Sequence, residues 1–480
     1  MVKIDKNKDI DDEVNAKNKE DKEEVKEENK NYNIDIVTGD PKRAIRKLSW
    51  PIMVSMFVTF SYNLADTIWV AGLGTESLAA LGFFMPIFLI IIGLGNGLGN
   101  GTNSLVARAI GEGDKKKADN AAMHGILLTI AISIIAPIII LFFLNDILLL
   151  MGAGVVAPLT SEYATIILIG LITLLLPSVG SSILRSEGDV TRAMNVMVCT
   201  AVLNIILDPI FIYVLGLGLR GAAYATLVSS SVAIVIIFYW IIIKKDTYLN
   251  ITIMDFNWNL GIIKKIISVA IPSTSETMTF SIVSLIINFL LSITAGPIGI
   301  AVYTAGWRIA NLAMIPQIGL GTATLTVVGV SYGARKFKKL ITTYDYAVKL
   351  GLSISIASGI IIFIFAPQIS MIFSYSDIAL IPAISEFLRI LSIFCMALPL
   401  GILSSMTFQG LGKGFISLFL TIQRALVFEV IFMYLFAFTL NMGTIGVWWG
   451  LALGGVFGYL VCYLVTKLYL REIEKVYIKS

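Results

Sequence analysis

Long apolar segments separated by short polar connections occupy nearly the whole chain from residue 48 onwards. Each segment reaches the length of about 18 residues or more that a helix needs to cross roughly 30 Å of hydrocarbon. Because lipid offers no hydrogen-bond partner to the backbone, such segments are expected to be helical. The pattern predicts twelve spans, at residues 48–71, 78–107, 121–144, 160–184, 193–215, 221–243, 265–294, 299–330, 342–366, 381–407, 415–440 and 444–467.

Basic residues gather at alternate connections between these spans. They precede the first span and follow the second, fourth, sixth, eighth, tenth and twelfth, whereas the other connections contain almost none apart from Arg220. Cytoplasmic loops of membrane proteins are enriched in lysine and arginine. The pattern therefore predicts a multi-pass protein of the plasma membrane with both termini in the cytoplasm.

Short motifs of the first half recur in the second half at one constant offset. Gly97–Gly99 recurs as Gly319–Gly321, and Gly111, with its basic tail, recurs as Gly333. Each half would hold six spans, and because six is even the two halves share one orientation in the membrane. The sequence thus predicts an all-α integral membrane protein with twelve helices in two six-helix lobes, related as a parallel repeat around a central cleft.

The domain boundaries follow from composition. Residues 1–40 are rich in lysine, acids and asparagine and poor in large apolar side chains, so they are expected to be a disordered cytoplasmic tail. The first lobe is placed at 41–243, a polar cytoplasmic linker at 244–264 and the second lobe at 265–480. The apolar run that begins near Leu48 is too long for a signal peptide and is interpreted as the first span.

Composition excludes several other classes of protein. Apolar residues make up 57% of the 480 positions and charged residues only 14%, and the small net charge of +4 argues against nucleic-acid binding. The cysteines, Cys199, Cys395 and Cys462, lie in apolar runs without metal-ligand spacing and are expected to be packing residues. His124, the single histidine, is interpreted as a packed interfacial residue. No catalytic arrangement, metal centre or organic cofactor is predicted.

Two acids lie within predicted spans of the first half, where a charge is costly and usually functional. Asp66 has Tyr62 four residues before it, and Asp208 has Asn204 four residues before it, so each pair shares one helix face. Thr226 lies at a similar depth on the sixth span. The two carboxylates would either share a proton near neutral pH or coordinate Na⁺. The alternative is that both acids are paired with basic residues or cap a helix near the surface.

Three further positions enter the prediction. Pro209 removes a backbone donor beside Asp208 and is expected to permit a helix bend. Glu276 lies near the middle of the seventh span and could attract a cationic substrate, unless neighbouring hydroxyls or Arg308 hold it. The role of Glu429 is left open, because pairing with Arg424 five residues earlier is poor in an α-helix.

Several stretches together resemble the multidrug and toxic compound extrusion (MATE) family, in its prokaryotic form. They are Tyr62–Thr67 leading to Ala71–Gly74, the loop Ala107–Asp114, its counterpart Ser331–Ala334, and Asn204–Pro209. The likeness extends in order over residues 40–470. Each motif alone is short, so the specificity comes from their order.

The resemblance implies a twelve-helix monomer in the lipid bilayer that exports small cationic or amphipathic molecules in exchange for H⁺ or Na⁺. Glu276 matches an acid that some members use in the second lobe, but spans eight to ten offer no aspartate partner. In prokaryotic members the coupling cation binds in the first lobe, at positions that correspond here to Tyr62, Asp66, Asn204, Asp208 and Thr226.

Three alternatives compete with this interpretation. A lipid-linked oligosaccharide flippase of the same superfamily would be expected to line its cleft with basic groups for a pyrophosphate, whereas the sequence suggests acids there. An intramembrane enzyme would need a nucleophile and a base that the sequence lacks, and an ATP-driven pump would need a Walker sequence.

Overall fold

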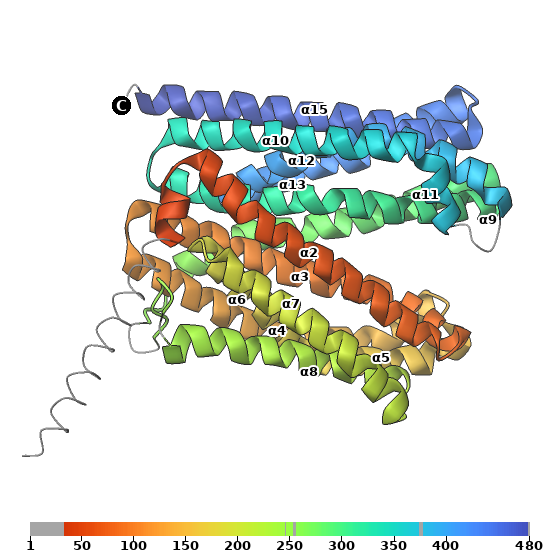
Figure 1. Cartoon of the computed structure of the whole chain (residues 1–480), viewed down its shortest axis with the longest axis horizontal. Helices are drawn as coiled ribbons and strands as arrows, with labels where there is room; N and C mark the ends of the chain where they lie inside the picture. The colour runs from red at the N-terminus through yellow and green to blue at the C-terminus, as the bar shows by residue number, and fades with distance from the viewer. Residues whose placement is uncertain (1–32, 245, 253–255, 374–377, 479–480) are drawn as a thin grey trace, which may run out of the picture.

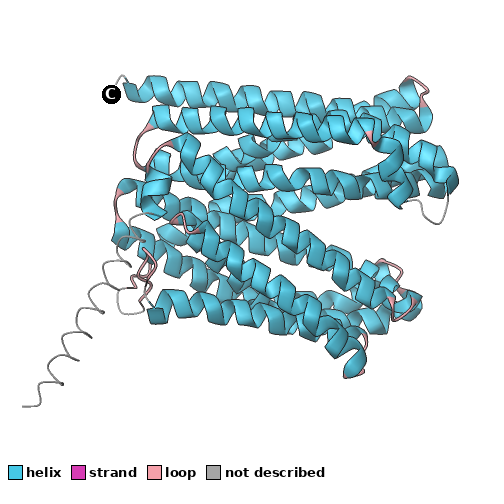
Figure 2. Ribbon diagram, viewed as in Figure 1, coloured by secondary structure: helices cyan, strands magenta, loops and turns pink. Residues whose placement is uncertain are grey.

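The computed structural model describes residues 33–244, 246–252, 256–373 and 378–478. Within these ranges every regular element is a helix (Figure 2). The α-helices are α2 (Pro41–Ala71), α3 (Thr75–Glu112), α4 (Lys115–Leu150), α5 (Ala157–Ile169), α6 (Leu171–Ser186), α7 (Val190–Pro209), α8 (Leu219–Phe238), α9 (Leu260–Gly333), α10 (Phe337–Ile364), α11 (Ala366–Phe373), α12 (Ile381–Gly410), α13 (Gly414–Ile422), α14 (Val430–Tyr434) and α15 (Gly443–Ile478).

The helices account for twelve membrane spans. Nine helices of the described ranges are long and apolar enough to cross a bilayer, and α5 and α6, bent by 49° at their junction, together form a tenth. Helix α9 has 74 residues and is interrupted at Gly296, whose φ of 62° is not helical, so it comprises two spans. Helix α2, with 31 residues, is long enough for the remaining span despite its polar start. The predicted fold class is thereby confirmed.

The spans are arranged in two groups. Figure 1 shows α4, α6, α7 and α8 on one side and α10, α12, α13 and α15 on the other, with α2, α3 and α9 between them. Helix α3 packs along α9, which brings the second and eighth spans together. A Cβ atom on Gly111 would overlap the Val330 carbonyl, and one on Gly333 would overlap the Arg108 carbonyl. The recurring glycines thus permit a reciprocal close crossing of the two halves, at the end of the bundle where α3 meets α4.

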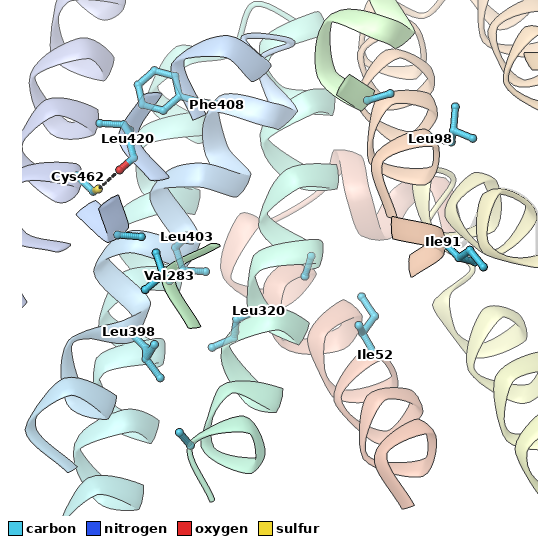
Figure 3. Packing of buried hydrophobic residues seen from close by; sticks show 14 of the residues in the cluster. Ile52, Ile91, Leu98, Val283, Leu320, Leu398, Leu403, Phe408, Leu420 and Cys462 are labelled. Carbon is cyan, nitrogen blue, oxygen red and sulfur yellow. Dashed lines mark hydrogen bonds between the residues drawn. The ribbon is translucent and has the colours of Figure 1, made fainter. Parts of the chain in front are cut away.

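Apolar side chains fill the interior and also cover the outside. Figure 3 shows Ile52, Leu98, Leu320 and Leu403 among the buried side chains that pack between helices. The outer surface of α4 exposes Ile138 and Phe142, by 65% and 78% respectively. Large exposed apolar side chains on a span are stable only against lipid, so the bundle surface is consistent with a membrane environment.

The structure modifies three expectations at the periphery. Residues 33–38 are helical and Val37 is fully buried, with its carbonyl accepting a hydrogen bond from Lys339 Nζ at 3.2 Å, so this part of the predicted tail is ordered. Residues 1–32 lie outside the described part of the chain. The second lobe's first helix begins at Leu260, inside the predicted linker. Cys199 is exposed rather than packed, whereas Cys395 and Cys462 are buried as expected.

His124 is packed against the linker. Its Nδ1 lies 2.8 Å from the Asn120 carbonyl, and its Nε2 accepts a hydrogen bond from the Asn259 backbone at 3.0 Å. The imidazole also packs against the rings of Phe256 and Trp258. The prediction of a packed histidine is confirmed, and its role is to hold the linker onto α4.

Candidate functional site

The residues predicted for the ion site meet on three helices of the first lobe. Tyr62 and Asp66 lie on α2, Asn204 and Asp208 on α7, and Thr226 on α8. Asn204 Nδ2 donates to Asp208 Oδ1 at 3.4 Å and contacts Thr226 Oγ1 at 3.5 Å. The two carboxylates and the Tyr62 phenol are close enough to interact electrostatically.

Three buried acceptor oxygens in this cluster receive no hydrogen bond from the described residues. They are Asp66 Oδ1, Asp208 Oδ2 and Asn204 Oδ1. No basic side chain in the described ranges forms an ion pair with either aspartate. An unsatisfied buried carboxylate oxygen is costly, and a proton or a small hard cation can satisfy it.

A site for Na⁺ in this cluster would consist of the two carboxylates together with neutral oxygens. No group of three or more His, Cys, Asp or Glu side chains within the described ranges is placed to hold a metal ion. The amide oxygen of Asn204, the hydroxyl of Thr226 and the phenol of Tyr62 are neutral oxygens in this cluster. Oxygen ligands of this mixed kind suit hard cations.

Helix α7 changes its geometry immediately after the cluster. Its α-helical part ends at Pro209, and a π-helical segment follows at Ile210–Val214. From this segment the Tyr213 hydroxyl donates to the Trp69 carbonyl of α2 at 2.5 Å. This segment connects α7 to α2 three residues beyond Asp66, and the helix bend expected at Pro209 stays a prediction.

The predicted cluster borders a cavity of about 420 Å³ between the two lobes. Tyr62, Asn204 and Thr226 line it from the first lobe, and residues of α9, α12 and η5, the π-helical segment Gln423–Glu429, line it from the second. Its charged lining residues are Arg185, Glu276 and Arg424. A cavity of this size, mostly apolar and with a few polar groups, is typical of a small-molecule site.

Glu276 faces the cavity as predicted, but its partners differ from those expected. Its carboxylate accepts hydrogen bonds from Ser405 Oγ at 3.1 Å, from Gln409 Nε2 at 3.2 Å and from Ser417 Oγ. These donors come from α12 and α13, which only the tertiary fold brings to the seventh span. The hydroxyls beside Glu276 in the sequence and Arg308 were therefore the wrong candidates.

Glu429 forms an ion pair with Arg424, contrary to the sequence analysis. Arg424 Nη1 lies 3.1 Å from Glu429 Oε1, and both side chains are buried. Both residues lie in the π-helical segment η5, in which hydrogen bonds run from residue i to i+5. That geometry places residues five apart on one face, so the α-helical assumption was wrong.

The position of Arg185 also differs from the one expected from the sequence. The predicted fourth span ends at residue 184, which leaves Arg185 among the basic residues of the connection after it. In the structure α6 extends to Ser186, and Arg185 lines the cavity. The expectation that only acids line the cleft is therefore wrong, because two arginines and one glutamate do so.

A hydrogen-bonded bridge joins the lobes at one end of the cavity. Asn100 Nδ2 on α3 donates to Ser273 Oγ at 3.1 Å and to Gln409 Oε1 at 3.0 Å. Because Gln409 also donates to Glu276, the bridge connects the first lobe to the second-lobe acid. Nearby, the side chains of Asn103 and Thr326 are hydrogen bonded to each other, again between the two lobes. Sequence reasoning missed Asn100 and Gln409, since a neutral amide in an apolar run gives no signal of its partner.

Comparison with known proteins agrees with this architecture. The family model for MatE matches residues 51–210 and 272–435. A solved structure described as the outward-facing conformation of a multidrug resistance MATE family transporter of the MOP superfamily is 43% identical, with a TM-score of 0.89 over 92% of this chain and 98% of that one.

Two curated relatives have different names. A FAD transporter of Shewanella oneidensis is 28% identical over 371 residues, covering 75% of this chain and 80% of its own. The multidrug export protein MepA of Staphylococcus aureus is 24% identical over 428 residues, covering 89% and 93%. Because the family model matches more than half of the chain, this protein belongs to the MatE family of multi-pass membrane transporters.

Proposed function

We propose that this protein is a secondary active transporter that exports cationic or amphipathic organic molecules in exchange for H⁺ or Na⁺. The observation that carries the proposal is the pair of aspartates beside the cavity, because Asp66 Oδ1 and Asp208 Oδ2 are buried and accept no hydrogen bond from the described residues. A carboxylate in that state has a strong affinity for a proton or a small cation. Asp66 and Asp208 are therefore the proposed coupling residues.

Binding of the coupling cation would change the shape of the first lobe. Neutralising the aspartates removes the repulsion between them and alters the contacts of α7 with α2 and α8. The π-helical segment after Pro209 is the part of α7 best able to bend in response, and Tyr213 would transmit that bend to α2. A ligand shifts such an equilibrium only through its different affinity for the two shapes, which the aspartates provide.

The proposed orientation places the basic connections in the cytoplasm, with the protein in the plasma membrane. The reciprocal glycine crossing and the Asn100–Gln409 bridge then lie toward the cytoplasmic side. Because the bridge joins the two lobes, movement of one lobe against the other would require it to break.

The flippase alternative gains one supporting observation, the presence of Arg185 and Arg424 in the lining. Arg424, however, is compensated by Glu429, so only one arginine is left for a pyrophosphate. Export of small molecules by a monomer remains the better proposal, and the named relatives favour transport over intramembrane catalysis.

Transport in proteoliposomes, with a pH gradient and a Na⁺ gradient imposed separately, tests the proposal. We expect one gradient to drive efflux of a cationic fluorescent dye, and Asp66→Asn or Asp208→Asn to abolish that efflux. Asp146→Asn, the same change at an exposed position on α4, is the matched control and should transport normally. Gradient-driven efflux at the wild-type rate from both cluster variants would refute the coupling role.

A further inference from the structure

The charge of Arg185 in the cavity lining is not explained by the proposed ion coupling. We propose that Arg185 binds an anionic group, a phosphate or a carboxylate, of an amphipathic substrate in the cavity. The inference rests on the proposed function to the extent that the cavity is taken to hold the transported molecule.

Among the described residues, Arg185 has no acid beside it, in contrast to Arg192 and Arg424. Arg192 lies 3.0 Å from Asp246, and Arg424 lies 3.1 Å from Glu429. No carboxylate of the described residues lies within ion-pair distance of Arg185. Its Nη2 is hydrogen bonded to Ser182, and its buried Nε has no hydrogen-bond partner within the described ranges. The guanidinium therefore retains most of its hydrogen-bonding capacity.

An uncompensated guanidinium within a membrane bundle is energetically unfavourable unless something binds it. The planar group presents parallel N–H donors that match the oxygens of a phosphate or carboxylate. Its position in the cavity lining, rather than at the lipid surface, makes a ligand in the cavity the natural source of that anion.

The other residues of the cavity lining indicate the chemical character of the molecule that would carry the anionic group. Met194, Met197 and Met406 line the cavity together with Phe280. Methionine and aromatic side chains adapt to flat or apolar bodies of different shape. Glu276, the acid of the lining, is already bonded to three donors and lies on the other lobe. An organic anion with an apolar or aromatic body fits this combination better than a free inorganic ion.

Riboflavin and its 5′-phosphate, FMN, form a suitable pair of probes, because they share one fluorescent aromatic body and differ in the phosphate. Their dissociation constants would be measured by fluorescence with purified protein in nanodiscs, without an ion gradient. We expect wild-type protein to bind FMN at least about tenfold more tightly than riboflavin, as a charge-assisted pair implies. Arg185→Gln should remove that preference and leave riboflavin binding unchanged. Arg43→Gln, which removes the same charge at an exposed position, should behave as wild type.

Three results would overturn the inference: equal affinity of wild-type protein for the two flavins, a preference for FMN that persists in Arg185→Gln, or no binding of FMN. Displacement of FMN by an equal concentration of inorganic phosphate would also overturn it, since the apolar body should contribute to affinity. Because no gradient is used, the outcome is separate from ion coupling. If both gradients fail to drive transport while FMN binding still depends on Arg185, the coupling proposal fails and the anion site stands.

Discussion

Replacing Glu429 by glutamine would leave Arg424 without its compensating charge inside the membrane bundle. The pair is separated by 3.1 Å, and the two side chains are only 6% and 4% exposed. Removing one partner of such a pair typically costs about 3–5 kcal/mol, because the remaining charge stays buried. Arg424 retains a hydrogen bond to the Tyr459 hydroxyl at 3.1 Å and stacks on the rings of Phe280 and Tyr459. The free energy of unfolding is therefore expected to decrease by an amount near the lower limit of that range, about 3 kcal/mol.

Unfolding of detergent-solubilised protein by SDS, followed by circular dichroism, would measure that loss. Glu162→Gln is the matched control, because Glu162 pairs with Arg220 on the exposed surface, and it should have a far smaller effect. The double variant Arg424→Gln with Glu429→Gln should recover much of the stability, since no uncompensated charge remains. If Glu429→Gln were no more destabilising than Glu162→Gln, or if the double variant were as unstable as the single one, the reasoning would be refuted.

Two further predictions concern the lobe crossing and the loops. Gly333→Ala should destabilise the protein by about 1–3 kcal/mol in the same SDS assay, because its Cβ would overlap the Arg108 carbonyl, whereas Gly82→Ala, with open space around it, should not. Equal stability of the two variants would contradict the close crossing. Burial, reinforced by Asp189, raises the pKa of Glu187 in the loop between α6 and α7 from about 4.5 to about 8. The folded state then binds the proton more tightly, so Glu187 makes stability fall as pH rises between these values. Glu187→Gln should make the decrease in stability with rising pH less steep. Glu76→Gln, the same change at an exposed site, should leave that decrease as in the wild type. An unchanged dependence of stability on pH in Glu187→Gln would exclude this role of Glu187.

The spans could be predicted because lipid imposes one simple rule, a long apolar helix, on every segment that crosses it. The grouping of Asp66 and Asp208 could also be anticipated, since both are conspicuous in apolar runs and their helical neighbours at a spacing of four lie on the same face. Their role as an ion site stays a prediction. The internal repeat placed Gly111 and Gly333 in equivalent positions, but their close crossing became evident only in the structure.

The remaining features depended on geometry that local sequence does not contain. The Arg424–Glu429 pair required a π-helical segment, which no spacing rule for α-helices predicts. The partners of Glu276 lie more than a hundred residues away in sequence, on α12 and α13. Arg185 resembled a loop residue because its helix continues for only one residue beyond it.

Cation binding by the aspartate cluster is the central claim, and it can be measured directly. Purified wild-type protein, Asp66→Asn, Asp208→Asn and the control Asp146→Asn would be compared for equilibrium binding of radioactive Na⁺ and, in weakly buffered solution, for proton uptake. The account predicts that wild type and Asp146→Asn bind one of the two cations and that both cluster variants lose this binding. Wild-type binding by Asp66→Asn and Asp208→Asn would contradict it.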